Sequence, residues 1–384
     1  MKRIIISLML TCIATISFAT DFYVAESFDN TNNRFNTISA AIAAASTGDK
    51  IYIQDKPVSG YEEDIIIAKS ISLINMNNNE RFTVTGKIYS YNPSVSLKIL
   101  GMELNGNILT VSKNVFVSNC LINGYIDADY LTCVNSDIRT ITSTNAKNFV
   151  LFGNKINQFA YQNHIPDENS QDTLILIGNR IGGEIFTSKT LFLNNNNVYA
   201  SIKNNEIIVQ YVNLNSGQYE FINNTIRTGY SININSQQSS TSLSFKFYNN
   251  ILVSANKLFI ESANELHAIT KREFKYNVTT NSVFYTDSLG KNINFDETNL
   301  TNATIAQVDE NSIFTGDNVN AGDPDPLMSD LDLTRNDAGC HGGPNSISNY
   351  FPQNDAGARV YKIEMPRRFF TGSNVNIKAY GVDK

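Results

Sequence analysis

Two aspartates and one arginine are the side chains in this sequence whose types and spacing best suit chemistry. Asp127 and Asp129 alternate with apolar residues, so a β-strand would project both carboxylates from one face. Arg139 opens the equivalent segment of the next unit, and Glu184 projects from a nearby one. Two such carboxylates can hold a hard cation such as Ca²⁺ through their oxygens. The alternative is a solvated outer face, whose charges keep exposed strands from aggregating.

Four aromatic residues are predicted to project from the same set of strands, namely Tyr125, Tyr161, Phe186 and Phe259. Exposed rings of this kind can stack on sugars, so with Glu184 they form the candidate substrate-binding group. Packing in the core or beneath loops is an equally good explanation for each ring. The sequence contains no Trp, which weakens the sugar-binding interpretation slightly.

The elements that must position these residues belong to a recurring unit of about twenty residues. Each unit has two alternating apolar residues, a short gap, an asparagine and another apolar residue, and successive asparagines lie 16, 19 and 25 residues apart. The units are Val115–Leu121, Leu131–Asn135, Val150–Ile156, Ile175–Ile181, Tyr219–Ile226 and Phe245–Ile251. Such a repeat predicts a solenoid, in which each rung buries its apolar side only against its neighbours.

Asparagine makes up about fifty residues, well above the usual share. Because asparagine tolerates left-handed backbone and can stack in side-chain ladders, we expect it at a corner after the second of three strands in each rung. Gly101 is predicted to hold this corner one rung before Asn119. Further along, Asn194–Asn197 and Asn204–Asn205 offer competing corners, and the sequence does not choose between them.

The first residues, Met1–Ala19, read as a secretory signal with Lys2 and Arg3 ahead of an apolar stretch. We expect cleavage near Ala19 and a secreted, periplasmic or cell-surface protein. No later run is long and apolar enough to cross a bilayer, so no transmembrane segment is expected in the mature chain. A net charge of −6 without any basic block argues against nucleic acid as a partner.

Three cysteines follow the signal, namely Cys120, Cys133 and Cys340. Cys133 falls in an inward column of its unit, whereas Cys120 follows its asparagine and falls in a different one. Buried thiols are therefore expected rather than a disulfide between these two. Without a CxxC pair, and with only three histidines, the sequence offers no support for a structural zinc site.

A short helix over Asn36–Ser46, followed by Gly48-Asp49-Lys50-Ile51-Tyr52-Ile53, Gly60-Tyr61 and Lys69–Leu73, carries a family resemblance over roughly residues 35–345. The order resembles the opening of parallel β-helix proteins of the pectin-lyase-like superfamily, in an uncharacterised branch of secreted bacterial members. The resemblance implies an all-β, right-handed parallel β-helix with an N-terminal capping helix and an irregular C-terminal cap. The capping helix is physically sensible, because it covers the open end of the strand stack.

The expected organisation is a signal peptide over 1–19, an N-terminal strand and capping helix over 20–49, and β-helix rungs over 50–295. A C-terminal cap with loops would follow over 296–359, and a hairpin or the start of a further β-domain over 360–384. Within the cap, Asn320–Pro326, Asp330–Asp332 and Asn336–Pro344 resemble the closing segment of secreted bacterial β-helix proteins. Their carboxylates suit calcium, but Gly, Pro and Asp are also simple turn formers, and we favour the cap.

The resemblance also implies candidate activities. Lyases of this superfamily hold Ca²⁺ on acidic side chains and use Arg or Lys as base, which would make Asp127 and Asp129 metal ligands and Arg139 catalytic. The long calcium and arginine motifs of pectate lyases are missing, as are those of polygalacturonases and pectin esterases. We therefore expect a non-catalytic module that binds an extracellular polysaccharide or a cell-surface partner. The alternatives are a calcium-dependent uronate lyase and a structural adhesin or stalk segment.

Overall fold

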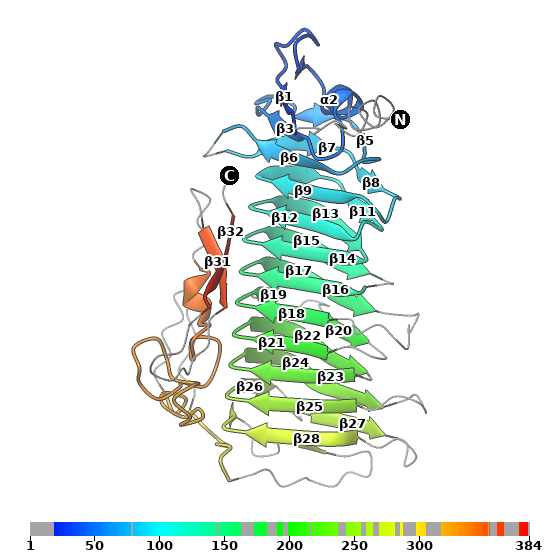
Figure 1. Cartoon of the computed structure of the whole chain (residues 1–384). Helices are drawn as coiled ribbons and strands as arrows, with labels where there is room; N and C mark the ends of the chain where they lie inside the picture. The colour runs from blue at the N-terminus through cyan, green and yellow to red at the C-terminus, as the bar shows by residue number, and fades with distance from the viewer. Residues whose placement is uncertain are drawn as a thin grey trace, which may run out of the picture.

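The chain was analysed as a computed structural model, which describes residues 19–77, 80–143, 146–162, 173–182, 190–194, 199–215, 217–236, 243–254, 259–263, 269–280, 285–286, 297–304, 316–351, 353, 359–364 and 376–382. Two large sheets, in which every pair of neighbouring strands is parallel, stack into an elongated parallel β-helix (Figure 1). The predicted signal segment lies outside the described residues up to position 18.

The first sheet contains, in spatial order, β2 (Arg34–Phe35), β1 (Asp21–Val24), β3 (Lys50–Ile53), β6 (Ile71–Asn75), β9 (Ser96–Leu100), β12 (Asn114–Ser118), β14 (Tyr130–Val134), β16 (Asn148–Phe152), β18 (Thr173–Ile177), β21 (Tyr199–Lys203), β23 (Gly217–Ile222), β25 (Leu243–Tyr248) and β28 (Ile269–Lys275). We call it the first wall. From β3 onward, each strand pairs with the equivalent strand of the next rung.

The second sheet contains β4 (Tyr61–Glu62), β5 (Ile65–Ile66), β7 (Phe82–Thr85), β8 (Ile88–Ser90), β10 (Met102–Asn105), β11 (Ile108–Thr110), β13 (Leu121–Ala128), β15 (Asp137–Ser143), β17 (Lys155–Gln162), β19 (Arg180–Gly182), β20 (Thr190–Asn194), β22 (Glu206–Asn215), β24 (Thr225–Ser236), β26 (Ile251–Ser254), β27 (Phe259–Ala263), β29 (Val278–Thr279) and β30 (Tyr285–Thr286).

The second sheet supplies two walls of each rung, because its long strands bend. The start of β13 pairs with β10 through Leu121 and Ile122, whereas its end pairs with β11 through Ile126–Ala128. The ladder register between β13 and β15 shifts between Ile122 and Tyr125, which marks the bend. The rungs therefore have the three expected strand segments. The later two form one continuous strand in some rungs, such as β13 and β15, and two separate strands in others, such as β10 and β11.

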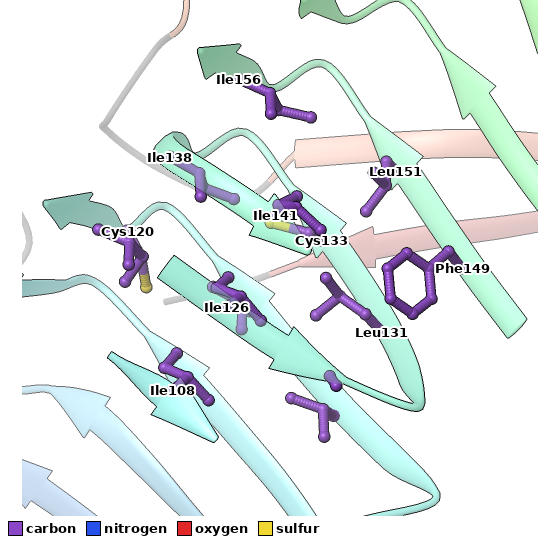
Figure 2. Packing of buried hydrophobic residues seen from close by; sticks show 14 of the residues in the cluster. Ile108, Cys120, Ile126, Leu131, Cys133, Ile138, Ile141, Phe149, Leu151 and Ile156 are labelled. Atoms are coloured by element: carbon purple, nitrogen blue, oxygen red, sulfur yellow. The ribbon is translucent and has the colours of Figure 1, made fainter. Parts of the chain in front are cut away.

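The core fills the inside of the shaft with columns of apolar side chains from each wall, two of which come from the first wall (Figure 2). Inward positions alternate with outward ones along each strand, so Leu131 and Cys133 are buried while Thr132 between them is partly exposed. Because successive rungs are in register, a side chain in one rung stacks on a similar side chain in the next. The rings of Phe221 and Phe247 are parallel, with centroids 4.6 Å apart.

The corner after the first wall contains two columns of residues, not the single asparagine column that the sequence predicted. The first corner position has a left-handed backbone, and its occupants are Gly101, Asn119, Asn135, Gly153, Gly178, Asn204, Asn223, Asn249 and Tyr276. The pairing of Val134 with Phe152 places Asn135 opposite Gly153, so Asn154 belongs to the second column. Aligning Asn135 with Asn154 was therefore wrong by one residue. Gly153 takes the left-handed position in place of an asparagine, because glycine adopts this backbone conformation readily. An alignment that counts only asparagines therefore misses the one-residue shift.

The second corner position carries a buried asparagine ladder through Asn154, Asn179, Asn205, Asn224, Asn250, Asn277 and Asn299. Each side-chain amide donates to the Oδ1 atom of the next, at 2.9 or 3.0 Å. Each also donates to a main-chain carbonyl of the preceding rung, as Asn205 does to Leu176 at 2.9 Å. The ladder thus satisfies polar groups that the corner would otherwise bury unpaired. Its use of Asn205 settles which of the competing corners is real.

The N-terminal end of the shaft is covered by helix α2 (Ile38–Ala44), as the sequence predicted. Thr37 caps it by accepting a hydrogen bond from the Ala40 amide, and the Glu63 carboxylate accepts from the amides of Ile38 and Ser39, each at 2.8 Å. The apolar face of α2 lies on the first rung of the core. Within the described part of the chain, no helix has the length and apolarity needed to cross a membrane.

The segment 316–351, which we call the C-terminal strap, runs back along the corner of the shaft. The Gly339 amide donates to the Asn249 carbonyl at 2.7 Å, and the Cys340 amide to the Thr225 hydroxyl at 3.1 Å. The short 3-10 helix η1 (Ile347–Asn349) follows, and just beyond the strap the Gln353 amide reaches the Gly153 carbonyl at 2.9 Å. Residues 316–351 of the expected cap therefore cover a flank of the shaft, whereas Asn299 and Leu300, which were also assigned to the cap, continue the ladder and the strand pairing of the last rung.

An antiparallel pair of strands, β31 (Arg359–Glu364) and β32 (Lys378–Val382), follows the strap. Figure 1 shows the pair beside the shaft and not at its far end. The Tyr361 ring lies 5.5 Å from that of Phe152, which points out of the first wall. Phe152 is buried although it follows an inward residue, because this returning part of the chain covers it.

Candidate functional site

The aspartate pair lies where β13 ends, on the outer side of the second sheet. Asp127 is the outward residue between buried Ile126 and Ala128, and Asp129 follows in the turn. Both carboxyls are half-buried, and desolvation raises the pKa of each above its usual value. The charge of Asp127 also raises the pKa of Asp129.

The cation beside this pair is Lys147 and not Arg139. Lys147 lowers the pKa of Asp129 through its charge, and its amide donates to the Asp129 carbonyl at 2.7 Å. The Lys147 ammonium also lies 5.6 Å from the centre of the Tyr130 ring. Lys147 directly precedes β16, one rung after Asp129. The repeat in the sequence did not predict that these two residues would be neighbours.

Arg139 is displaced from the aspartates along its strand. Asp127 pairs with Thr142 of β15, three residues beyond Arg139, which corresponds to about 10 Å along a strand. The register shift between Ile122 and Tyr125 places Arg139 at the bend of the rung, where its side chain is exposed. The expected grouping of two carboxylates with an adjacent arginine is therefore not formed.

Arg139 instead shares an open depression of about 620 Å³ with Tyr125. The polar lining of this depression comes from four rungs and also includes Asn107, Thr140, Thr142 and Gln158. The Thr140 hydroxyl lies 3.4 Å from the Gln158 side-chain oxygen. A phenol, a guanidinium, two hydroxyls and two amides thus converge on one hollow. This combination can donate to and accept from a ligand rich in hydroxyl groups.

A close approach between two rungs shapes this depression. A Cβ atom at Gly124 would lie 2.1 Å from the Gly106 carbonyl oxygen, so only glycine fits there. The Asn107 side chain accepts a hydrogen bond from the Tyr125 amide at 3.0 Å and so fixes the backbone under the phenol. Sequence analysis missed Asn107, Thr140, Thr142 and Gln158. The signal that could have identified Thr140 and Gln158 was their position in the register of the sheet, because Tyr125 pairs with Thr140, and Thr140 with Gln158.

Tyr161 does not belong to this surface, and its placement among substrate-binding residues was wrong. Its side chain is 1% exposed, its hydroxyl donates to the Lys147 carbonyl at 2.5 Å, and its ring meets Phe149 edge-on at 5.2 Å. Along β17, Phe159 and Tyr161 both point inward, so a sugar cannot reach the ring. The main-chain carbonyl of Lys147 satisfies the buried hydroxyl, as is usual for a tyrosine in a core.

The remaining predicted aromatic and acidic residues cannot be placed on the surface. Phe259 begins β27 and pairs with Ile232 of β24, but its side chain lies outside the described part of the chain. Glu184 and Phe186 fall wholly outside the described residues.

The acidic block of the strap uses its carboxylates to hold turns together. Asp330 accepts hydrogen bonds from the amides of Gly343 and Asp337, and Asp337 accepts from the Asn320 amide at 2.6 Å. Desolvation raises the pKa of Asp330 and of Asp337. Across the described ranges, no three His, Cys, Asp or Glu side chains come together as a metal site would require.

Cys120, Cys133 and Cys340 are free and buried, as predicted. Burial raises the pKa of Cys120 to about 11 and that of Cys340 to about 12. The Cys133 thiol lies 3.3 Å from the Asn154 side-chain oxygen, inside the core. Thiols held in this way are structural rather than nucleophilic.

Comparison of the chain with protein-family models, with curated proteins and with solved structures finds no match. The arrangement of the depression is therefore the basis on which a function can be inferred.

Proposed function

We propose that this protein is an exported, non-catalytic module that binds an extracellular glycan through the outer side of its second sheet. The observation that carries the proposal is the convergence of Tyr125, Arg139 and four polar side chains on one open depression. Sugars present alternating hydroxyl and C–H surfaces. A phenol ring beside amides, hydroxyls and a guanidinium complements both.

Binding is favoured over catalysis by the separation of the charged groups. General acid–base chemistry needs a proton donor or acceptor within hydrogen-bond reach of the substrate atom it serves. Here the carboxylates of Asp127 and Asp129 lie with Lys147, while Arg139 stands about three residues further back along its neighbouring strand. The predicted base, Arg139, and the predicted cation-binding pair therefore lie too far apart to act on the same bond of a substrate. This separation weakens the lyase alternative.

We also propose that the chain is a right-handed β-helix of the pectin-lyase-like superfamily. The helix over the open end, the following Gly48-Asp49-Lys50 turn and strand, and the asparagine ladder support it. Export follows from Met1–Ala19, and its check is the mass of the protein recovered from the producing cell, which should lack these residues.

The function is tested with the purified protein on a broad array of extracellular polysaccharides and oligosaccharides. We expect binding that Arg139→Ala and Tyr125→Ala each weaken at least tenfold. Lys98→Ala is the matched control, because it removes an exposed cation from the first wall and leaves the depression intact. Absence of binding to every glycan would overturn the proposal, as would equal binding by the Arg139 variant and the control.

A further inference from the structure

A pair of tyrosines forms a flat aromatic surface in the rung just before the first rung of the depression. Tyr89 projects outward from β8, and Tyr91 follows it in the turn. Their ring centroids are 5.9 Å apart and their planes differ by 25°, so the rings stack. Tyr91 is 72% exposed although its ring is large and apolar. Neither residue belongs to the depression described above.

Apolar side chains from the neighbouring strands extend this surface. Ile66 of β5 and Leu109 of β11 are the register partners of Tyr89 on either side. Ile66 is 66% exposed, and Val111, which follows β11, is 38% exposed. We call the group of Ile66, Tyr89, Tyr91, Leu109 and Val111 the tyrosine platform. Exposed tyrosine rings that lie side by side present an apolar face with polar tips, which suits stacking against a ligand of mixed polarity.

The polar rim of the tyrosine platform is the aspartate pair. Asp127 is the register partner of Leu109 on the next strand, so the outward column reads Ile66, Tyr89, Leu109, Asp127 across four rungs. The half-buried carboxylates of Asp127 and Asp129 therefore stand at the edge of the platform. This gives both aspartates a place in binding that does not require calcium.

We propose that the tyrosine platform and its two aspartates form a second subsite, which binds a neutral sugar of the same glycan that occupies the depression. This inference rests on the proposed function. The platform is two side chains wide along the strands and three strands deep, about 7 by 10 Å. Such an area suits one or two sugar rings and is far below the roughly 800 Å² per partner of a stable protein interface.

The charge of the rim selects the class of sugar. A carboxylate accepts hydrogen bonds only, so Asp127 and Asp129 suit the hydroxyl groups at the edge of a sugar stacked on the tyrosines. The charge of Lys147 partly offsets that of Asp129, whereas Asp127 has no such counter-charge among the described residues and repels a uronate carboxylate brought to this position. The platform thus favours a neutral sugar, whereas the Arg139 end of the surface tolerates an anionic one.

The relative positions of the platform and the depression also determine the direction in which the ligand would lie. Tyr89 lies two strands before the strand that carries Asp127 and Tyr125, which corresponds to about 10 Å across the sheet. A glycan that contacts both the platform and the depression must therefore run across the strands, parallel to the long axis of the shaft. Affinity should rise with oligosaccharide length until both subsites are filled.

The experiment is calorimetric titration of the protein with two length series, one of neutral hexose oligosaccharides and one of uronate oligosaccharides. We expect Tyr91→Ala and Tyr89→Ala each to lower affinity for long neutral oligosaccharides five- to tenfold and to leave the shortest bound ones unaffected. Asp127→Asn should raise affinity for the uronate series. Tyr23→Ala is the matched control, because Tyr23 stacks on Tyr52 at 5.6 Å on the first wall and is 38% exposed.

The outcomes separate this subsite from the function beneath it. If Arg139→Ala abolishes binding while both tyrosine variants bind like the control at every length, the platform is overturned and the glycan-binding function stands. Tighter binding of uronate than of neutral oligosaccharides by the unmodified protein would overturn the choice of sugar class. If the unmodified protein binds neither series nor any arrayed glycan, the function fails and the subsite fails with it.

Discussion

Asn223 and Asn336 exchange two hydrogen bonds between their side-chain amides, at 2.8 and 3.3 Å, although 113 residues separate them. Both side chains are buried. Asn223 holds a left-handed corner of the shaft, and Asn336 belongs to the C-terminal strap. The pair joins the repeating part of the protein to the part that does not repeat.

Replacing Asn336 by Ala should release the strap from this corner. The Asn223 amide would lose the Asn336 side chain but keep the Asp337 carbonyl at 2.9 Å, so we expect a cost of about 1 kcal/mol in unfolding free energy. Chemical denaturation measures the loss, and limited proteolysis should show faster cleavage within 316–351. Asn349→Ala, in the partly exposed end of the strap, is the control. Unchanged stability and cleavage in Asn336→Ala would contradict a fastening role.

Gly178 provides a test of a second contact between the strap and the shaft. Its φ is +65°, and a Cβ there would lie 2.1 Å from the Tyr350 ring. Gly178→Ala should therefore strain the backbone and displace the ring, lowering the unfolding free energy by about 1–3 kcal/mol. Combining Gly178→Ala with Tyr350→Ala removes the clash and should recover part of the loss. If the double variant is as unstable as the sum of the two single ones, the ring contact is not the cause.

Asn205 tests the ladder itself. It accepts from the amide and side chain of Asn179, and it donates to Leu176 and Asn224, all within 3.0 Å. Asn205→Ala leaves several buried groups unpaired, so we expect a loss of about 3 kcal/mol in unfolding free energy. Asn123→Ala, which removes an exposed amide pair with Asn105, should cost less than about 0.5 kcal/mol. Similar losses in the two variants would argue that the ladder adds little.

His341 should make the protein less stable in acid. Burial, and then the charge of Arg180, lower its pKa to about 4 in the folded protein from an ordinary value of 6.5. Between about pH 6.5 and 4 the unfolded chain therefore binds a proton that the folded chain refuses, and stability falls as pH falls through this window. Thermal unfolding midpoints should decline less steeply over this range in His341→Gln. Parallel declines in the two proteins would place the histidine in solvent.

The cysteines should be silent toward thiol reagents in the native protein. Burial raises the pKa of Cys120, Cys133 and Cys340, and none is exposed. We expect no labelling of these three by a maleimide until urea unfolds the shaft, after which all three react. Labelling of Cys340 alone before global unfolding would indicate that the strap opens by itself.

Several local features could be predicted because they depend on neighbours in the sequence. Alternation along the strands identified inward residues such as Cys133, and the capping residue and apolar spacing identified the helix after Thr37. The outward placement of Asp127 followed from the same alternation. The parallel β-helix itself was predictable because a recurring unit with one apolar side can be buried only by stacking.

What the sequence could not predict was which residue of one rung lies beside which residue of the next. Gly153 and Asn135 share a corner column, so counting asparagines misaligned the rungs, and Tyr161 was assigned to the wrong side. Arg139 lies farther from Asp127 than predicted because the register shifts at a bend. The position of this bend depends on backbone packing between rungs.

The amino-acid sequence by itself determined the period of the shaft, its apolar interior and the helix at its end, since these arise from preferences within one rung. The tertiary structure alone decided the lateral register, the neighbours of each outward side chain and the path of the strap. Those depend on contacts between residues a rung or more apart, such as Asn223 with Asn336, for which the linear pattern carries no distance information.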